Sequence, residues 1–185
     1  MGKSIFSRLA SSSSTQAQTP FITKTGVYVI ELQRIRTGET QDKTPFYASD
    51  IMVDEVLSEM PLPAKVVAFN ATAKKERQIP EGTHAEGETL SFYVKIANPW
   101  IENKLGNVKN HAEATLEVLG IDDYAEWGED QWHEAIMDQE KGLASGDGTL
   151  CKGVKLVMTS EARVAKGGDS AYIVNTFAPY LSSEE

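Results

Sequence analysis

The chain has 185 residues, of which 41% are hydrophobic, with a formal net charge of −9 and an isoelectric point near 4.9. This length supports one sizeable core and is short for two, and no apolar run approaches the roughly 20 residues that span a bilayer. The acidic total excludes a uniformly basic nucleic-acid-binding surface. The single cysteine, Cys151, excludes an internal disulfide and favours a reducing, cytoplasmic compartment.

The charge is unevenly distributed along the chain. Residues 99–150 contain twelve acids and three bases, which accounts for the whole net charge, whereas the remaining residues carry equal numbers of acids and bases. Local charge, rather than the total, decides what a groove attracts. The sequence therefore predicts an acidic segment beside a neutral-to-basic remainder.

The N-terminal region, residues 1–25, is predicted to be a flexible arm. It contains the run Ser11-Ser-Ser-Ser-Thr15 and lacks the apolar segment of a secretory signal. A single ordered domain is expected over residues 26–180, with an acidic helical insert at residues 99–148. Residues 181–185 form a short acidic tail.

The first half of this domain is predicted to be rich in strands. Residues 26–36 alternate as a strand until Ile35 breaks the pattern, which predicts a bulge or sharp bend near Gln33. A second strand is expected over residues 46–57, and residues 64–71 are a short apolar stretch compatible with a further strand. The polar residues that follow, up to Gly87, indicate a loop or the bend of a long hairpin. Residues 89–96 are the clearest strand, because apolar and polar side chains alternate throughout.

The second half begins with helices and returns to strands. Apolar residues from Leu105 to Leu119 recur at helical spacing, with Gly120 as a C-cap, and a second helical stretch runs from Asp122 towards Lys141. Two further strands are expected over residues 149–164 and 170–177. The order β-β-(β)-β-α-α-β-β argues against alternating βαβ units. It favours a mainly β fold with a helical insert, a small antiparallel OB-like barrel.

No arrangement of side chains typical of catalysis or metal binding stands out. The three histidines, His84, His111 and His133, have no metal-ligand spacing, and no nucleophile elbow or phosphate-binding loop is present. The chain is therefore predicted not to be an enzyme and to need no metal or cofactor. A metal-dependent nuclease using the acidic insert is a weaker alternative, because its carboxylates show no fixed spacing.

Several strands combine aromatic and basic residues, which is the chemistry that single-stranded nucleic acid requires. Bases stack on aromatic rings, and cations neutralise phosphates. The acidic insert would then face away from the nucleic acid or contact another protein. The predicted binding residues are Arg34, Arg36, Tyr47, Tyr93, Lys95, Trp100, Lys152, Lys155, Arg163, Lys166 and Tyr172.

The order of elements and several short motifs resemble the OB-fold single-stranded DNA-binding proteins of tailed bacteriophages. The resemblance covers residues 26–180, although residues 59–87 are longer than the pattern requires and the acidic tail is shorter than in many such proteins. The matching motifs are Gly26-Val-Tyr28, Arg34-Ile-Arg36, Gly87-Glu-Thr-Leu-Ser-Phe-Tyr-Val94, Gly106-Asn-Val-Lys109, Leu119-Gly120, Gly153-Val154 and Phe177-Ala-Pro179.

This resemblance implies sequence-tolerant binding and protection of single-stranded DNA during phage-type replication or recombination, in the host cytoplasm and without catalysis. The expected partners are single-stranded DNA and, through the acidic insert, replication or recombination proteins; no membrane is expected, and homo-oligomers are possible through strand edges. The alternative is a protein–protein interaction module or phage structural module without a nucleic-acid role.

Overall fold

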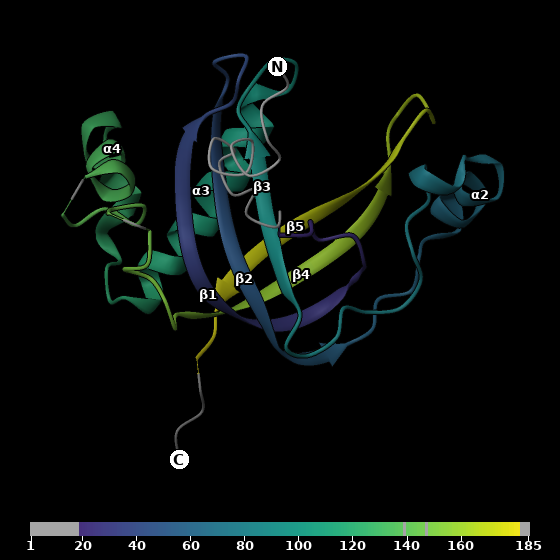
Figure 1. The fold of residues 1–185 in the computed structure, drawn as a ribbon, viewed down its shortest axis with the longest axis horizontal. Helices are drawn as coiled ribbons and strands as arrows, with labels where there is room; N and C mark the ends of the chain where they lie inside the picture. The colour runs from purple at the N-terminus through teal and green to yellow at the C-terminus, as the bar shows by residue number, and fades with distance from the viewer. Residues whose placement is uncertain (1–18, 139, 147, 182–185) are drawn as a thin grey trace, which may run out of the picture.

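The computed structural model describes residues 19–138, 140–146 and 148–181. Its centre is a five-stranded antiparallel sheet in the order β3-β2-β1-β4-β5 (Figure 1). The strands are β1 (Gly26–Glu39), β2 (Pro45–Ser58), β3 (Thr89–Lys95), β4 (Lys155–Val164) and β5 (Ala171–Pro179). The α-helices of the described part are α2 (Ala64–Thr72), α3 (Ile101–Val118) and α4 (Glu129–Met137), and two short 3₁₀ helices are η1 (Lys75–Arg77) and η2 (Asp123–Glu126).

The prediction of a mainly β fold with a helical insert is confirmed, but the predicted barrel is not. Strands β3 and β5 are the two edges of the sheet, and no pairing between them closes it within the described residues. The register of β1 on β2 shifts between Leu32 and Arg34, which confirms the predicted bulge at Gln33. Bulges increase the local twist and bend a strand, so they help to curl the sheet.

Helix α3 packs between the two edge strands. Its His111 is fully buried and stacks on Phe92 of β3, with ring centroids 5.4 Å apart, while Phe177 of β5 meets the same imidazole edge-on at 4.6 Å. Its Asn110 accepts a hydrogen bond from Phe177 N–H (2.8 Å) and donates one to Phe177 C=O (3.2 Å). At Phe177, the backbone N–H and C=O on the unpaired edge of β5 thus both find a hydrogen-bond partner in one side-chain amide.

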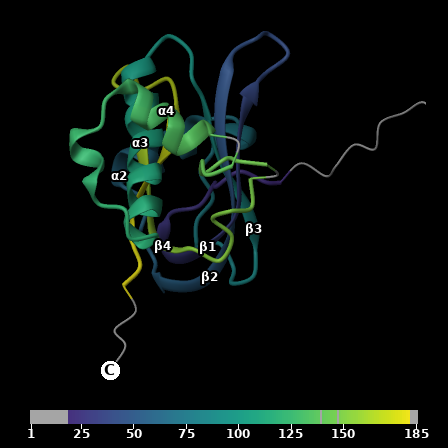
Figure 2. The same ribbon diagram turned by 90° about the vertical axis from the view of Figure 1, so that its left-hand side faces the viewer.

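The two helices of the acidic insert, α3 and α4, lie on one side of the sheet, as the rotated view shows (Figure 2). Trp127 and Trp132 are half-buried and contact each other with ring centroids 5.2 Å apart, and both pack against the core. These contacts anchor the helical insert to the core. Gly120 adopts a φ of 80° just after α3, a conformation that favours glycine and ends the helix as predicted.

Two predictions about irregular segments were wrong. Residues 64–71 belong to helix α2 rather than to a strand: Pro63 precedes the helix, its composition is alanine-rich, and only Val66 is buried. Residues 19–25, assigned to the flexible arm, are anchored, because Pro20 C=O accepts a hydrogen bond from Ser91 N–H (2.7 Å) and Thr25 Oγ1 donates one to Met60 C=O (2.6 Å). The rest of that arm and residues 182–185 of the acidic tail lie outside the described residues.

Candidate functional site

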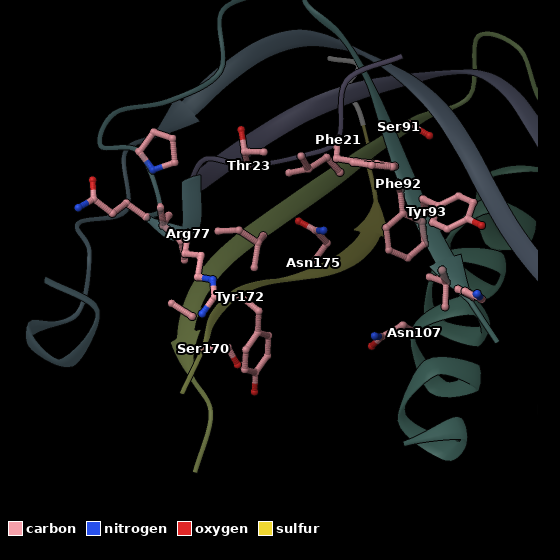
Figure 3. Close-up of a pocket in the computed structure, with 18 of the residues that line it drawn as sticks. Phe21, Thr23, Arg77, Ser91, Phe92, Tyr93, Asn107, Ser170, Tyr172 and Asn175 are labelled. Atoms are coloured by element: carbon pink, nitrogen blue, oxygen red, sulfur yellow. The ribbon is translucent and has the colours of Figure 1, made fainter. Parts of the chain in front are cut away.

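A groove of about 1050 Å³ lies between the two edge strands of the sheet (Figure 3). Tyr93 lines it from β3, Tyr172 from β5 and Asn107 from α3. Phe21, from the segment before β1, and Arg77, from the segment that follows α2, also line the groove. The groove therefore occupies the gap where a closed barrel would have paired β3 with β5.

Three aromatic side chains, Phe21, Phe46 and Tyr93, form a cluster at the β3 side, which we call the aromatic ridge. Phe46 stacks on Tyr93 with centroids 5.5 Å apart and 26° between the rings, and Phe21 lies 5.8 Å from Tyr93. Phe46 and Tyr93 meet as a diagonal pair on the outer face of neighbouring strands, because Phe46 aligns with Lys95, two residues away from Tyr93. Tyr93 is 37% exposed and Phe21 49% exposed, so the ridge presents aromatic surface to a ligand.

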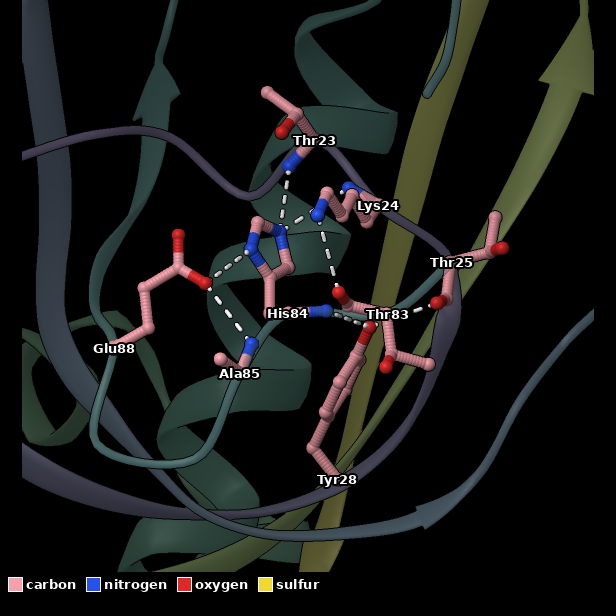
Figure 4. Close-up of polar contacts among 8 residues, drawn as sticks. All are labelled: Thr23, Lys24, Thr25, Tyr28, Thr83, His84, Ala85 and Glu88. Atoms are coloured by element: carbon pink, nitrogen blue, oxygen red, sulfur yellow. Dashed lines mark hydrogen bonds and ion pairs between the residues drawn. The ribbon is translucent and has the colours of Figure 1, made fainter. Parts of the chain in front are cut away.

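The position of Phe21 depends on a buried histidine (Figure 4). Nε2 of His84 accepts hydrogen bonds from the backbone N–H groups of Thr23 (3.1 Å) and Lys24 (3.2 Å). Because Nε2 is the acceptor, Nδ1 carries the proton and donates to the Glu88 carboxylate at 3.1 Å. Burial lowers the pKa of His84 below its ordinary value, although Glu88 opposes the shift. The neutral imidazole thus fixes the segment that carries Phe21.

Three cations line the groove: Arg77, Lys95 and Lys104. Lys95 Nζ pairs with Asp42 at 2.7 Å, and this hydrogen bond holds the pKa of Asp42 well below its usual range. Lys104 Nζ donates to Ala97 C=O at 2.8 Å. Among the described residues, no carboxylate lies within ion-pair distance of Arg77. The lining also includes two acids, Glu76 and Asp169.

The structure brings three of the predicted binding residues, Tyr93, Lys95 and Tyr172, to this groove. Arg34 and Arg36 lie on the outer face of the sheet, and the register aligns Arg36 with Ala48, which in turn aligns with Tyr93. Arg36 therefore shares a cross-strand row with the centre of the aromatic ridge.

Both arginines bind one buried carboxylate. Asp50 Oδ2 lies 2.8 Å from Arg34 and Asp50 Oδ1 lies 3.0 Å from Arg36. Burial opposes the ionisation of Asp50, but the hydrogen bonds and charges of Arg36 and Arg34 outweigh it and hold the pKa of Asp50 below its ordinary value. Two cations against one carboxylate leave a net positive charge beside the ridge.

Tyr47 was predicted to contact nucleic acid, and this prediction was wrong. Its side chain points to the inner face of β2, is 1% exposed and shares a 2.8 Å hydrogen bond with Nδ1 of His111. A residue that is one position out of phase on a strand faces the opposite side, so β2 directs the half-buried Phe46 outward and buries Tyr47 in the core.

The other predicted residues lie outside the groove. Trp100 is 72% exposed just before α3. Lys155 pairs with Asp54 at 2.7 Å and Arg163 with Glu161 at 2.9 Å, so both charges are locally balanced. Lys152 precedes β4, and Lys166 lies in the turn between β4 and β5; neither lines the groove.

Sequence reasoning missed Phe21, Phe46, Arg77 and Asn107. Phe46 was available from the alternation of β2, because Tyr47, Ile51 and Val53 share the buried phase of the strand and Phe46 lies in the opposite phase. Phe21 and Arg77 carry no periodic signal, since each reaches the groove through long-range packing of an irregular segment.

The described part of the chain offers no group of three or more potential metal ligands, and none of its helices has the length and apolar character needed to cross a membrane. No protein-family model matches the sequence, and a search of curated proteins finds no match.

Proposed function

We propose that this protein binds single-stranded DNA without sequence preference and without catalysis, in the groove between β3 and β5. The single observation that carries the proposal is the aromatic ridge at the wall of a groove that also presents Arg77 and Lys104. Exposed rings accept any base by stacking, and cations bind the phosphates between bases.

The charge pattern supports this use of the groove despite the net charge of −9. The groove lining contains three cations and two acids, and no described acid of the 99–150 segment belongs to it. The acidic side chains of α3 and α4 therefore lie outside the lining that a polyanion would contact. They remain available to a protein partner of replication or recombination, which is the role we propose for them.

We further infer an open barrel of the OB type. The strand order β3-β2-β1-β4-β5, with α3 between β3 and β4, supports this inference, because pairing β3 with β5 would complete a five-stranded barrel. In OB folds the face of strands 2 and 3 binds oligonucleotides, and here β2 and β3 carry the ridge. The position of the ridge on β2 and β3 also supports the resemblance to phage single-stranded DNA-binding proteins. We therefore propose that the protein acts in the host cytoplasm.

The test is the affinity of Tyr93→Ala for a fluorescein-labelled oligomer of about 30 thymidines, measured by anisotropy at low salt. Loss of one stacking ring should weaken binding by about 1–3 kcal/mol, which is roughly 5- to 150-fold. Tyr93→Phe keeps the ring and should bind like the wild type. Tyr180→Ala, a tyrosine outside the groove, is the matched control.

Wild-type protein that binds neither this oligomer nor a mixed-sequence single strand would refute the proposed function. Binding that Tyr93→Ala leaves intact would instead remove the ridge from the site. A matched duplex should bind much more weakly, since its bases are not available for stacking.

A second candidate function is the binding of an extended peptide by strand addition. The observation that favours it is that the groove lies between two sheet edges, and one of them already accepts a parallel bridge between Phe21 and Ser91. Two results together would support this alternative: the protein does not bind nucleic acid, and the β3 amides become protected from hydrogen exchange when a partner peptide is added.

A further inference from the structure

The segment 59–87, which contains α2 and η1, adds no strand to the sheet, yet it is firmly attached to it. Val66 and Ile79 form a small buried cluster with Ala162 of β4, and Ile173 of β5 packs against this cluster. The segment is therefore held on the β4–β5 side of the groove, opposite the aromatic ridge. It stands beside the β4–β5 hairpin, away from α4 (Figure 1).

The loop that carries Arg77 is braced from within the segment. The side chain of Asn70 in α2 donates to Ile79 C=O (3.0 Å) and accepts from Ile79 N–H (3.1 Å). Gln78 Nε2 donates in return to Asn70 C=O at 2.6 Å. These hydrogen bonds tie the end of α2 to Gln78 and Ile79, and they therefore fix the backbone directly after Arg77.

Arg77 points into the groove from this braced loop. It lines the groove together with Phe69 and Ile79 of the same segment and Tyr172 of β5, and the close-up shows Arg77 and Tyr172 on one side of the groove and Tyr93 on the other (Figure 3). No described carboxylate pairs with Arg77, although Glu76 lines the same groove.

The exposed cations Lys74 and Lys75 directly precede Glu76 and Arg77. The stretch of four residues therefore carries three positive charges and one negative charge. A braced loop with a net positive charge at the rim of an aromatic groove suits a strand whose bases and phosphates face opposite walls.

We propose that the segment 59–87 is a second wall of the nucleic-acid site, in which Arg77 binds a backbone phosphate while the bases stack on the aromatic ridge. This inference rests on the proposed function and extends it to a part of the chain that neither strand periodicity nor the motif resemblance assigns to binding. Lys74 and Lys75 attract the strand at the rim through their charge. A groove walled in this way admits one strand, with its bases towards Phe21 and Tyr93.

The experiment measures the affinity of full-length protein for the labelled thymidine oligomer between 50 and 200 mM NaCl. Each phosphate contact on a single strand contributes about 0.7 to the slope of log K against log salt. Arg77→Ala should lower that slope by about 0.7, so its affinity deficit relative to the wild type should shrink about 2.6-fold across this fourfold range of salt. Arg77→Lys keeps the charge and should restore most of the slope.

The matched control is Lys65→Ala, which removes an exposed cation of α2 that does not line the groove. It should leave the slope unchanged, which separates a direct contact from a change in net charge. A thermal unfolding scan of each variant confirms that the small cluster around Val66 is intact.

The outcomes separate this inference from the function on which it rests. Suppose that Tyr93→Ala weakens binding, but that Arg77→Ala and Lys65→Ala show the same slope of log K against log salt. This result would refute the role of segment 59–87 as a second wall and would leave the proposed function intact. A wild type that binds no single strand would overturn both.

Discussion

Protonation of the buried His111 should destabilise the fold in a pH range where few other groups titrate. The imidazole is fully buried between Phe92 and Phe177, its Nδ1 shares a hydrogen bond with Tyr47, and its Nε2 has no partner in the described structure. Burial lowers the pKa of His111 to about 3. The cation would therefore enter an aromatic core that offers it no counter-charge.

The magnitude follows from the difference between the folded and unfolded pKa values. A histidine in an unfolded chain has a pKa near 6.5, so the unfolded state binds more protons and stability falls as the pH drops below that value. The stabilisation is complete above pH 6.5 and is lost progressively towards pH 3. With a folded pKa of about 3, His111 should remove about 2 kcal/mol of the free energy of unfolding between pH 7 and pH 5.

The assay is urea unfolding at pH 7 and pH 5, applied to the wild type and to the double variant Tyr47→Phe/His111→Phe. The double variant removes both partners of the buried hydrogen bond and keeps aromatic rings at both positions, a change that is often nearly neutral for stability. Its loss of stability between the two pH values should be smaller than that of the wild type by about 2 kcal/mol, because His84 and the carboxylates titrate in both proteins.

An equal loss in the two proteins would refute the reasoning. It would mean that His111 is either protonated in the folded state at pH 5 or exposed to solvent, and neither state is compatible with the packing of α3 between β3 and β5.

Two further predictions concern the edges of the groove. Asn110→Ala should cost about 1–3 kcal/mol of unfolding free energy in a urea titration, because it leaves both backbone groups of Phe177 without their partner; a cost equal to that of the exposed control Asn103→Ala would contradict the edge-covering role. Protonation of His84 removes the acceptor of the Thr23 and Lys24 N–H groups, and since its folded pKa is lowered, the free energy of opening of these amides in hydrogen exchange should fall as the pH drops below about 6.5. The same free energy at pH 7 and pH 5 would show that His84 does not hold this segment.

Much of the β framework could be predicted from the sequence because it depends on local alternation. Leu90, Phe92 and Val94 face the core and Tyr93 and Lys95 face outward, as a period of two requires. The bulge at Gln33, the glycine that ends α3 and the helical nature of the acidic insert followed from equally local signals. Tyr93, Lys95 and Tyr172 were found for this reason.

Only the tertiary structure decided which of these residues meet. Tyr47 and Phe46 are neighbours in sequence, yet the pleat buries Tyr47 against His111 and places Phe46 on the opposite face, where it stacks on Tyr93. Phe21 and Arg77 reach the groove from irregular segments that are fixed by His84 and by Asn70, through hydrogen bonds spanning 61 and 9 residues. Composition and periodicity do not predict such contacts, because the free energy of each contact depends on which distant groups the folded chain brings together. The sequence by itself therefore determined the strands, the helical insert and their faces, and the folded chain determined the groove.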